Sequence, residues 1–493
     1  MKILSKIAVV AIIILFAPSC GKELDLKPVS QISNSSFWKT ENDATGALFG
    51  MYTRLRTEAS SNLFLLGEAR SESLGRSLAA ATNEQFITNS LTSADAGPDW
   101  TGFYRTIHDA NLILKYVPGI TFTSEAVKNN ILAQAYAMRA YVYFVITRSW
   151  GDATIITEPT EGYNSGTNQK IRSPQVEVFK LIKEDIEKAL TLFPDNNFAT
   201  GRNVWSKPAT QALKGDVFLW TAKRLNGGTT DLTAALSALT EVEIADVTLL
   251  PNFEQIFDYT NKGNKEILMA VRFQDIEVTA HNIHQNMYIS SVYMPVNADA
   301  ESKQAIGVLG GAPFMTISNT ARTQFTSDDL RKKPTFTEIY TVNATTGVRT
   351  FYGSAVLKFN GFVNSGGVRM FLDDIILYRF ADVLLMKAEA KNALGQDPSV
   401  EMNRVRQRAY GPNFSSHVFV SGTKEQNDAD ILQERLFEMI FEGKRWWDLV
   451  RFGKAFDLVP SLQSRRGQDH LLLFPISDVT LSLEPNVKQN PGY

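Results

Sequence analysis

The sequence predicts a mainly α-helical protein, in which a scaffold of stacked helical hairpins is interrupted by a loop-rich insertion with a few short strands. Two blocks, about 36–225 and 372–456, carry apolar residues at helical spacing. Between them, about 226–371, glycines cluster and strand-like runs such as EILMAVRF appear. No low-complexity linker divides the chain, so residues 20–493 are expected to form one domain.

The first block contains five expected helices with recognisable ends. Thr40 is expected to cap the first helix, and Gly151 is expected to end the third. Ser206, with Pro208 two residues later, is expected to begin the fifth. The helices are expected at residues 40–55, 100–117, 126–151, 173–194 and 206–225.

The second block predicts helices at 373–395, 398–409 and 428–453, with Asp373 or Asp374 as a cap for the first. Helices of this length with alanine-rich contact faces favour stacked hairpins, although a strict 34-residue repeat is absent.

The N-terminus has the pattern of an export signal. Lys2 and Lys6 precede an apolar run, 7–17, which is too short to span a bilayer. It ends at APSC, which holds the only cysteine, Cys20, and resembles a bacterial lipobox. We interpret 1–19 as a signal peptide and Cys20 as the lipidated residue, which predicts an anchored protein. The alternative is a buried, small hydrophobic cysteine.

Two charged residues close behind Cys20 refine this localisation. Lys22 and Glu23 resemble the charged signal that directs some lipoproteins to the outer face of the outer membrane. Surface display is therefore expected, with a simple solvated tether as the alternative.

The stretch FEGKRWWDLVRFG, 441–453, places two tryptophans among cations. Apolar residues occupy nearly every face, which indicates a buried helix rather than a binding platform. Its charges then need partners: Asp448 lies three residues from an arginine on each side, whereas Glu438 and Glu442 need cations from elsewhere.

The formal net charge of the whole chain is −2, which disfavours nucleic acid as a partner.

The segment ERLFEMIFEGKRWWDLVRFG, 434–453, resembles the C-terminal signature of the SusD/RagB family of outer-membrane nutrient-binding lipoproteins. The ending FPISDVTLSLEPNVKQNPGY resembles the family's terminal segment, although FPIS lacks a second proline that is common there. Further matches follow in family order: WTGFYRTIHDANLIL, AYAMRAYVYFVITRSWGD, EVFKLIKEDIEKAL, LLPNFEQIFDYTNKGNKEILMAVRF, DDIILYRFADVLLMKAEA and NRVRQRA.

The resemblance implies a scaffold of tetratricopeptide-like hairpins and a surface lipoprotein that lids a SusC-type, TonB-dependent outer-membrane transporter. Glycans are the implied ligand class, with peptides as the alternative. No catalysis and no cofactor are expected.

Motifs for catalysis are absent from the sequence. It contains no His-Glu-x-x-His, Gly-x-Ser-x-Gly or phosphate-binding glycine loop. His281 and His284, with Asp275 or Glu277, could share a metal, but a polar surface pair is the favoured interpretation and no metal is predicted. A surface glycosidase, which needs two facing carboxylates, and a scaffold for a protein partner remain alternatives.

Sugar binding requires aromatic rings and planar polar side chains on supported loops. Two stretches, 67–100 and 281–295, supply them. For Trp100 the alternative is packing within the scaffold. The candidate ligand-binding residues are Arg70, Glu72, Arg76, Asn83, Phe86, Asn89 and Trp100 in the first stretch, and His284, Asn286, Tyr288 and Tyr293 in the second.

Overall fold

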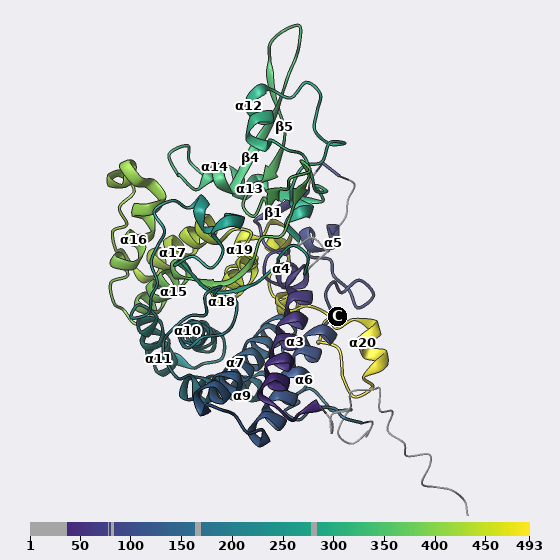
Figure 1. Cartoon of the computed structure of the whole chain (residues 1–493). Coiled ribbons are helices and arrows are strands. Elements are labelled where there is room, and N and C mark those ends of the chain that lie inside the picture. Colours follow the sequence, from purple (N-terminus) through teal and green to yellow (C-terminus); the bar gives the residue numbers. More distant parts are fainter. Residues whose placement is uncertain (1–36, 77, 80–82, 163–168, 278–282) are drawn as a thin grey trace, which may run out of the picture.

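The computed structural model describes residues 37–76, 78–79, 83–162, 169–277 and 283–493. Helices dominate it (Figure 1), which confirms the predicted fold class. The helices that build the scaffold are α3 (Glu41–Ala59), α4 (Asn62–Gly67), α6 (Thr101–Tyr116), α7 (Glu125–Trp150), α9 (Gln175–Leu192), α10 (Lys207–Arg224), α11 (Gly228–Val242), α15 (Phe380–Ala393), α16 (Ser399–Tyr410), α17 (Lys424–Met439) and α18 (Arg445–Arg451).

These helices pack in series. Helix α3 packs on α6, α6 on α7, α7 on α9, α9 on α10 and α10 on α11, after which α11 contacts α15 and α15 contacts both α16 and α17. Each helix buries an apolar face against its neighbours, and α7 is buried on all sides from Ala137 to Trp150. The described part of the chain thus forms the expected scaffold of paired helices.

Local sequence signals set several helix ends as predicted. The Thr40 side chain accepts from the backbone N–H of Asp43, whose carboxylate accepts in return from the Thr40 N–H, a complete capping box. Ser206 caps α10 through the N–H of Ala209. Gly151 ends α7 with a φ of 83°, a conformation that glycine adopts without strain.

Short strands and short helices make up further parts of the described chain, and most of the strands lie in its middle. The strands are β1 (Leu74–Arg76), β2 (Ile267–Val271), β3 (Met315–Ile317), β4 (Phe336–Val342), β5 (Arg349–Val356), β6 (Phe362–Val363), β7 (Arg369–Met370) and β8 (Ile375–Arg379). They form antiparallel pairs β1–β3, β2–β8, β4–β5 and β6–β7. The short helices are α5 (Glu84–Ile87), α12 (Ala300–Ile306), α13 (Asn319–Arg322), α14 (Lys332–Thr335), α19 (Ala455–Leu458) and α20 (Asp478–Leu483).

The insertion has its own small core and a projecting hairpin. Tyr288, Ile339 and Phe371 belong to an apolar cluster separate from the scaffold core. The β4–β5 hairpin extends away from the helices of the scaffold in Figure 1. Residues 228–242, expected within the insertion, instead form α11 and pack on α10 and α15, so the helical scaffold continues beyond residue 225.

The expected helix at 373–395 is corrected in its first turns. Ile375 to Arg379 form strand β8, paired with β2, and α15 begins at Phe380. All five residues of β8 are buried, so its apolar run fits a strand covered on both faces. Asp374 caps no helix: it accepts from Arg272 Nε at 2.9 Å and from the Phe273 N–H at 3.1 Å.

The stretch 441–453 is buried, as its composition predicts. Gly443, with a φ of 71°, lies in the turn between α17 and α18, and both tryptophans belong to the core. Asp448 pairs with Arg451 at 2.9 Å, as predicted, but Arg445 pairs with Glu72 instead. Cations from other elements reach Glu438 and Glu442.

Candidate functional site

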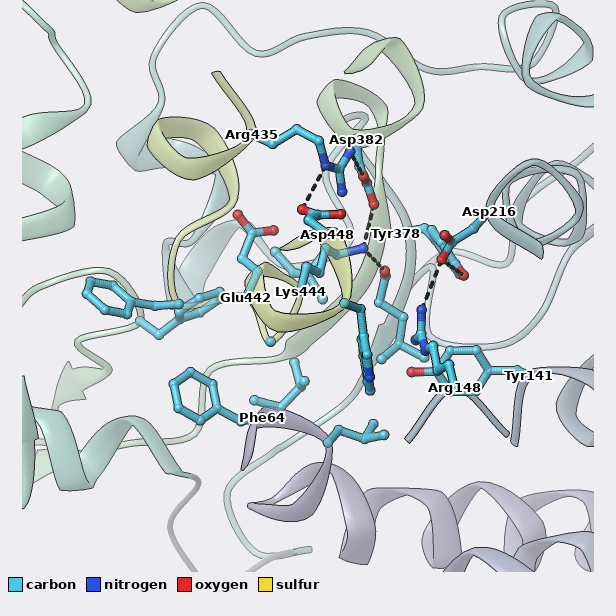
Figure 2. A pocket seen from close by; sticks show the side chains of 18 of the residues that line it. Phe64, Tyr141, Arg148, Asp216, Tyr378, Asp382, Arg435, Glu442, Lys444 and Asp448 are labelled. Atoms are coloured by element: carbon cyan, nitrogen blue, oxygen red, sulfur yellow. Dashed lines mark hydrogen bonds and ion pairs between the residues drawn. The ribbon is translucent and has the colours of Figure 1, made fainter. Parts of the chain in front are cut away.

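A small internal cavity lies among the charged side chains around α18 (Figure 2). Lys444 and Arg435 both bond Asp382, and Arg148 bonds Asp216 across the same space. The cavity holds about 40 Å³, which is room for a few water molecules at most. It belongs to the buried ion-pair network and is too small for a sugar.

A much larger groove, of about 850 Å³, opens between the insertion, the region around β1 and the C-terminal segment. This volume falls in the range of ligand sites. Its lining includes Glu72, Arg76 and Glu84 on one side, Phe351 and Tyr352 of β5 on another, and residues of the 3-10 helix η6 (Pro460–Arg465). We take this groove as the candidate functional site.

Backbone pairing fixes the walls of the groove. Strand β1 pairs with β3 so that Arg76 lies opposite Met315. The Thr316 hydroxyl of β3 donates to the Ser354 carbonyl of β5 at 2.9 Å, and the Ser318 N–H donates to the Ser73 carbonyl at 2.9 Å. The region of β1 is thereby tied to the hairpin, and side chains on the two walls are held in fixed relation.

A β-bulge places two neighbouring aromatic residues in the groove. Ile339 pairs with Gly353 and Tyr340 with Phe351, so Tyr352 has no counterpart on β4. Adjacent residues of a regular strand point to opposite faces, but a bulge re-aims side chains locally. It explains why both Phe351 and Tyr352 line the groove.

The two rings differ in how much remains available to a ligand. The Arg322 guanidinium lies 4.4 Å above the Phe351 ring, and Tyr340 packs edge-on against it. Tyr352 is 38% exposed, and it makes no hydrogen bond, ring stacking or cation–π contact with the residues that the structure describes. Tyr352 is therefore the ring free to stack.

A paired arginine supplies polar groups. Arg76 Nε donates to both carboxylate oxygens of Glu84, at 2.7 and 2.9 Å, and the Arg76 side chain is 70% exposed. Its hydrogen bond to Glu84 raises the pKa of Arg76. The pair fixes one edge of the guanidinium and leaves further N–H groups to meet a ligand.

Hydroxyl and carboxylate groups complete the lining. Thr88, Thr320, Ser461 and Ser464 border the groove. Glu72 accepts from Arg445 Nε at 3.0 Å through one oxygen, while its other oxygen is buried and has no hydrogen-bond partner among the described residues. An aromatic ring beside a guanidinium and several hydroxyls suits a polyhydroxylated ligand.

Three residues predicted near this site are internal instead. Arg70 is fully buried, stacks on Trp446 and Phe474, and donates to the Leu473 carbonyl at 2.7 Å. Asn89 accepts from Arg70 at 2.8 Å, and Phe86 is 2% exposed. Asn89 donates to the hydroxyl of Ser461, which borders the groove, at 3.0 Å. Asn83, with a φ of 62°, precedes α5 but does not border the groove.

Trp100 packs within the scaffold. It precedes α6, is 5% exposed, and meets Tyr104 and Trp150 edge to face at centroid distances of 5.7 and 6.0 Å. It borders a separate hollow of about 310 Å³ beside α20. The alternative that the sequence left open, packing in the scaffold, describes its position.

The second predicted stretch also points inward. Tyr288 is 1% exposed and its hydroxyl donates to the Ile306 carbonyl. His284 is buried and stacks on Phe359 at 4.2 Å, and burial lowers its pKa to about 3. Asn286 and Tyr293 are half-buried and border none of the hollows described above.

Metal ligation finds no support around His284. His281 lies outside the described residues, and the described part of the chain brings no three His, Cys, Asp or Glu side chains together as a metal site. His284 itself does not border the groove.

Of the predicted residues, Glu72 and Arg76 reach the groove, whereas Phe351 and Tyr352 were missed. The sequence TGVRTFYGSAV carries alternation and an aromatic pair, but it does not reveal the bulge at Tyr352.

Two family models match the chain. One, described as the SusD family, matches residues 339–493, and the other, described as starch-binding associating with outer membrane, matches residues 24–219. The described residues include no helix with the length and apolar character of a membrane span.

Similar proteins cover nearly the whole chain. B. fragilis NanU shares 34% identity with a TM-score of 0.85, over 95% of this chain and all of that chain. A SusD superfamily protein from Bacteroides vulgatus shares 32% identity with a TM-score of 0.82, over 92% of this chain and all of the other. SusD-like protein P38 of Formosa agariphila is 28% identical over 508 residues, 96% of each chain.

Proposed function

Because the protein belongs to the SusD family of glycan-binding proteins, we propose that it binds an oligo- or polysaccharide in the groove between β1, β5 and η6, without catalysis. The observation that carries this proposal is the exposed Tyr352 ring, which lies at a β-bulge, lines an 850 Å³ groove and makes no hydrogen bond or ring contact with the described residues.

The groove has the chemistry that a sugar needs. The apolar face of a sugar ring stacks on Tyr352, and its hydroxyl groups meet the Arg76 guanidinium and the serine and threonine hydroxyls opposite. Arg76 is held in place by Glu84, so little freedom is lost when it binds.

Binding without hydrolysis is the favoured form of this activity. A glycosidase needs one carboxyl group to protonate the leaving oxygen and a second to attack or to activate water. Both glutamates of the groove are engaged by arginines, Glu84 by Arg76 and Glu72 by Arg445. The second oxygen of Glu72 has no partner among the described residues but is buried, so neither carboxylate is presented to a glycosidic bond.

The N-terminal sequence and the family support a proposal for the location and the partner of the protein. We propose that Cys20 carries the lipid that anchors the protein to the outer membrane, exposed at the cell surface, and that the bound glycan passes to a SusC-type, TonB-dependent transporter. Replacing Cys20 by serine is expected to move the protein from the membrane fraction to the soluble fraction. Retention in the membrane after the replacement would contradict the anchor.

The binding proposal is tested with substitutions at Tyr352. Affinity electrophoresis in soluble starch, laminarin, xylan and pectin identifies the polysaccharide that retards the protein. Tyr352→Ala is then expected to weaken binding about tenfold, because the stacking surface is lost. Tyr352→Phe keeps the ring and is expected to stay within about threefold of the parent protein.

A neighbouring substitution serves as the matched control. Val348, 57% exposed just before β5, does not line the groove, so Val348→Ala is expected to leave retardation unchanged. Equal retardation of the Tyr352→Ala variant and the parent protein would place the ligand elsewhere. Binding of peptides and of no polysaccharide would favour the peptide-binding alternative.

A further inference from the structure

A second hollow lies on the helical scaffold and shares no lining residue with the groove. It holds about 400 Å³ and is bordered by one face of α3, on which Phe49, Thr53 and Arg56 recur at helical spacing. Phe49 is 61% exposed, whereas Leu48 and Met51, on the inner side of α3, are buried. An exposed ring thus stands at the edge of a hollow of ligand size.

The opposite wall is built by the chain leaving β2. Arg272 Nε donates to Asp374 at 2.9 Å and Arg272 Nη2 to the Gly201 carbonyl at 2.9 Å. Arg56 crosses the hollow to Glu277 at 3.0 Å. These bonds hold both guanidinium groups in place, so the hollow has a fixed polar frame before any ligand arrives.

Two side-chain amides in this hollow are uncommitted. Asn203, in the connection before α10, and Gln274, after β2, both line it. Neither side chain makes a hydrogen bond to any residue that the structure describes. Each planar amide offers two donors and an acceptor, which is the pattern that recognises neighbouring hydroxyl groups.

We propose that this hollow is a second sugar-binding site, in which one sugar ring stacks on Phe49 and its hydroxyl groups bond Asn203 and Gln274. The choice of ligand class rests on the proposed function of the groove. Two sites on one protein would hold separate segments of a long polysaccharide, and engagement of both would raise the apparent affinity for the polymer above that of either site.

The experiment compares four proteins in the polysaccharide that retards the parent most strongly in affinity electrophoresis. They are the parent protein, Phe49→Ala, Tyr352→Ala and the double variant. Each single variant is expected to retain part of the retardation, and the double variant to lose it, with affinity at least about tenfold below that of Tyr352→Ala. Ile244→Ala removes a residue of 70% exposure outside both sites and is the control.

Hydrogen–deuterium exchange locates the second site independently of affinity. Addition of the same polysaccharide to the Tyr352→Ala variant is expected to slow exchange in residues 49–56 and 272–274. Circular dichroism of the Phe49→Ala variant should match the parent, because an exposed side chain contributes little to folding.

The outcomes separate the two sites. Complete loss of binding in Tyr352→Ala, with no protection of residues 49–56, overturns the second site and leaves the groove. Loss of binding in Phe49→Ala but not in Tyr352→Ala supports the hollow and contradicts the groove. No retardation of the parent protein by any polysaccharide overturns both.

Discussion

Arg379 shows how single residues hold this protein together. Its side chain is fully buried and donates to Glu266 at 2.8 Å, to Glu438 at 2.6 Å, and to both oxygens of Glu442 at 2.8 and 2.9 Å. One guanidinium therefore satisfies three buried carboxylates. Because such groups are costly to bury without a cation, Arg379 is a central residue of the fold.

Replacing this residue tests its importance directly. Arg379→Met is expected to lower the free energy of unfolding by about 3–5 kcal/mol, since it leaves buried carboxylates without their shared partner. Urea denaturation measures the change. Arg466→Met is the control, because Arg466 is 63% exposed and its ion pair with Asp457 is a surface contact of about 1 kcal/mol or less. Equal stability of the two variants would contradict this role.

At the scale of residues, the sequence predicted which buried charges need partners better than it predicted which side chains are exposed. It indicated correctly that Glu438 and Glu442 need cations from other elements, because a charge on a helix that is apolar all round requires a partner. It could not tell that Tyr288 and Phe86 are core residues while Tyr352 faces a groove. Exposure depends on contacts between distant segments, which local patterns do not encode.

At the scale of elements, the close approach of α4 to the α17–α18 turn depends on glycine. A Cβ atom placed on Gly67 would lie 1.9 Å from the Gly443 carbonyl oxygen and 2.8 Å from the Trp447 ring. Only a glycine permits this separation between the two backbones. The contact joins the first helices of the chain to its C-terminal signature.

Two glycine-to-alanine substitutions in helices test this contact. Gly67→Ala is expected to destabilise the protein by about 2 kcal/mol or more, because backbone atoms must shift. Gly50→Ala, in the middle of α3, meets no atom within 4 Å and is expected to stabilise it by up to about 1 kcal/mol. Thermal unfolding of both variants gives the comparison. Stabilisation by Gly67→Ala would show that the backbones lie farther apart.

Helices could be predicted wherever the helical spacing of apolar residues extends over many residues. Helices α3, α6, α7, α9 and α10 lie where apolar spacing and caps place them. The segment 375–379 was predicted as helix, because a short apolar run has no periodicity that distinguishes a strand from a helix. Its pairing with β2 makes it a strand.

At the scale of the whole molecule, buried ion pairs join the insertion to the helical scaffold. Arg331 bonds Glu434 at 2.7 Å and Glu438 at 3.1 Å, and Lys358 bonds Glu442 at 2.6 Å. Arg331 precedes the β4–β5 hairpin in the chain and Lys358 follows it, whereas Glu434 and Glu438 lie on α17 and Glu442 in the turn before α18. The wall that carries Tyr352 is thus fixed to the helices by charge pairs.

The same kind of pairing predicts acid sensitivity. Burial alone would raise the pKa of Glu389, but Arg451 and Lys223, each 2.9 Å away, lower it from 4.5 to about 2. A carboxylate whose pKa is lowered in the folded state stabilises the protein at pH values above its pKa in the unfolded state. This contribution, about 3 kcal/mol, is lost as the pH falls from about 4.5 towards 2.

Urea unfolding at several pH values between 5 and 2 tests this dependence. The parent protein is expected to lose stability steeply across this range, and Glu389→Gln to lose less, because the variant has no proton to bind at this position. Parallel curves for the two proteins would contradict the contribution of Glu389.

The sequence predicted the overall architecture because its signals extend over long stretches, but it did not predict the groove. The groove forms where residues near 76, 352 and 464 meet, and these positions are joined by strand pairing and packing across most of the chain. Such long-range contacts leave no local pattern.

We propose that the protein binds a glycan without cleaving it. The most direct measurement is isothermal titration of the parent protein with the retarding polysaccharide, with reducing ends assayed in the same samples. Saturable binding with a constant number of reducing ends is the predicted result. Release of reducing ends that rises with time and protein concentration would instead identify a glycoside hydrolase and contradict the claim.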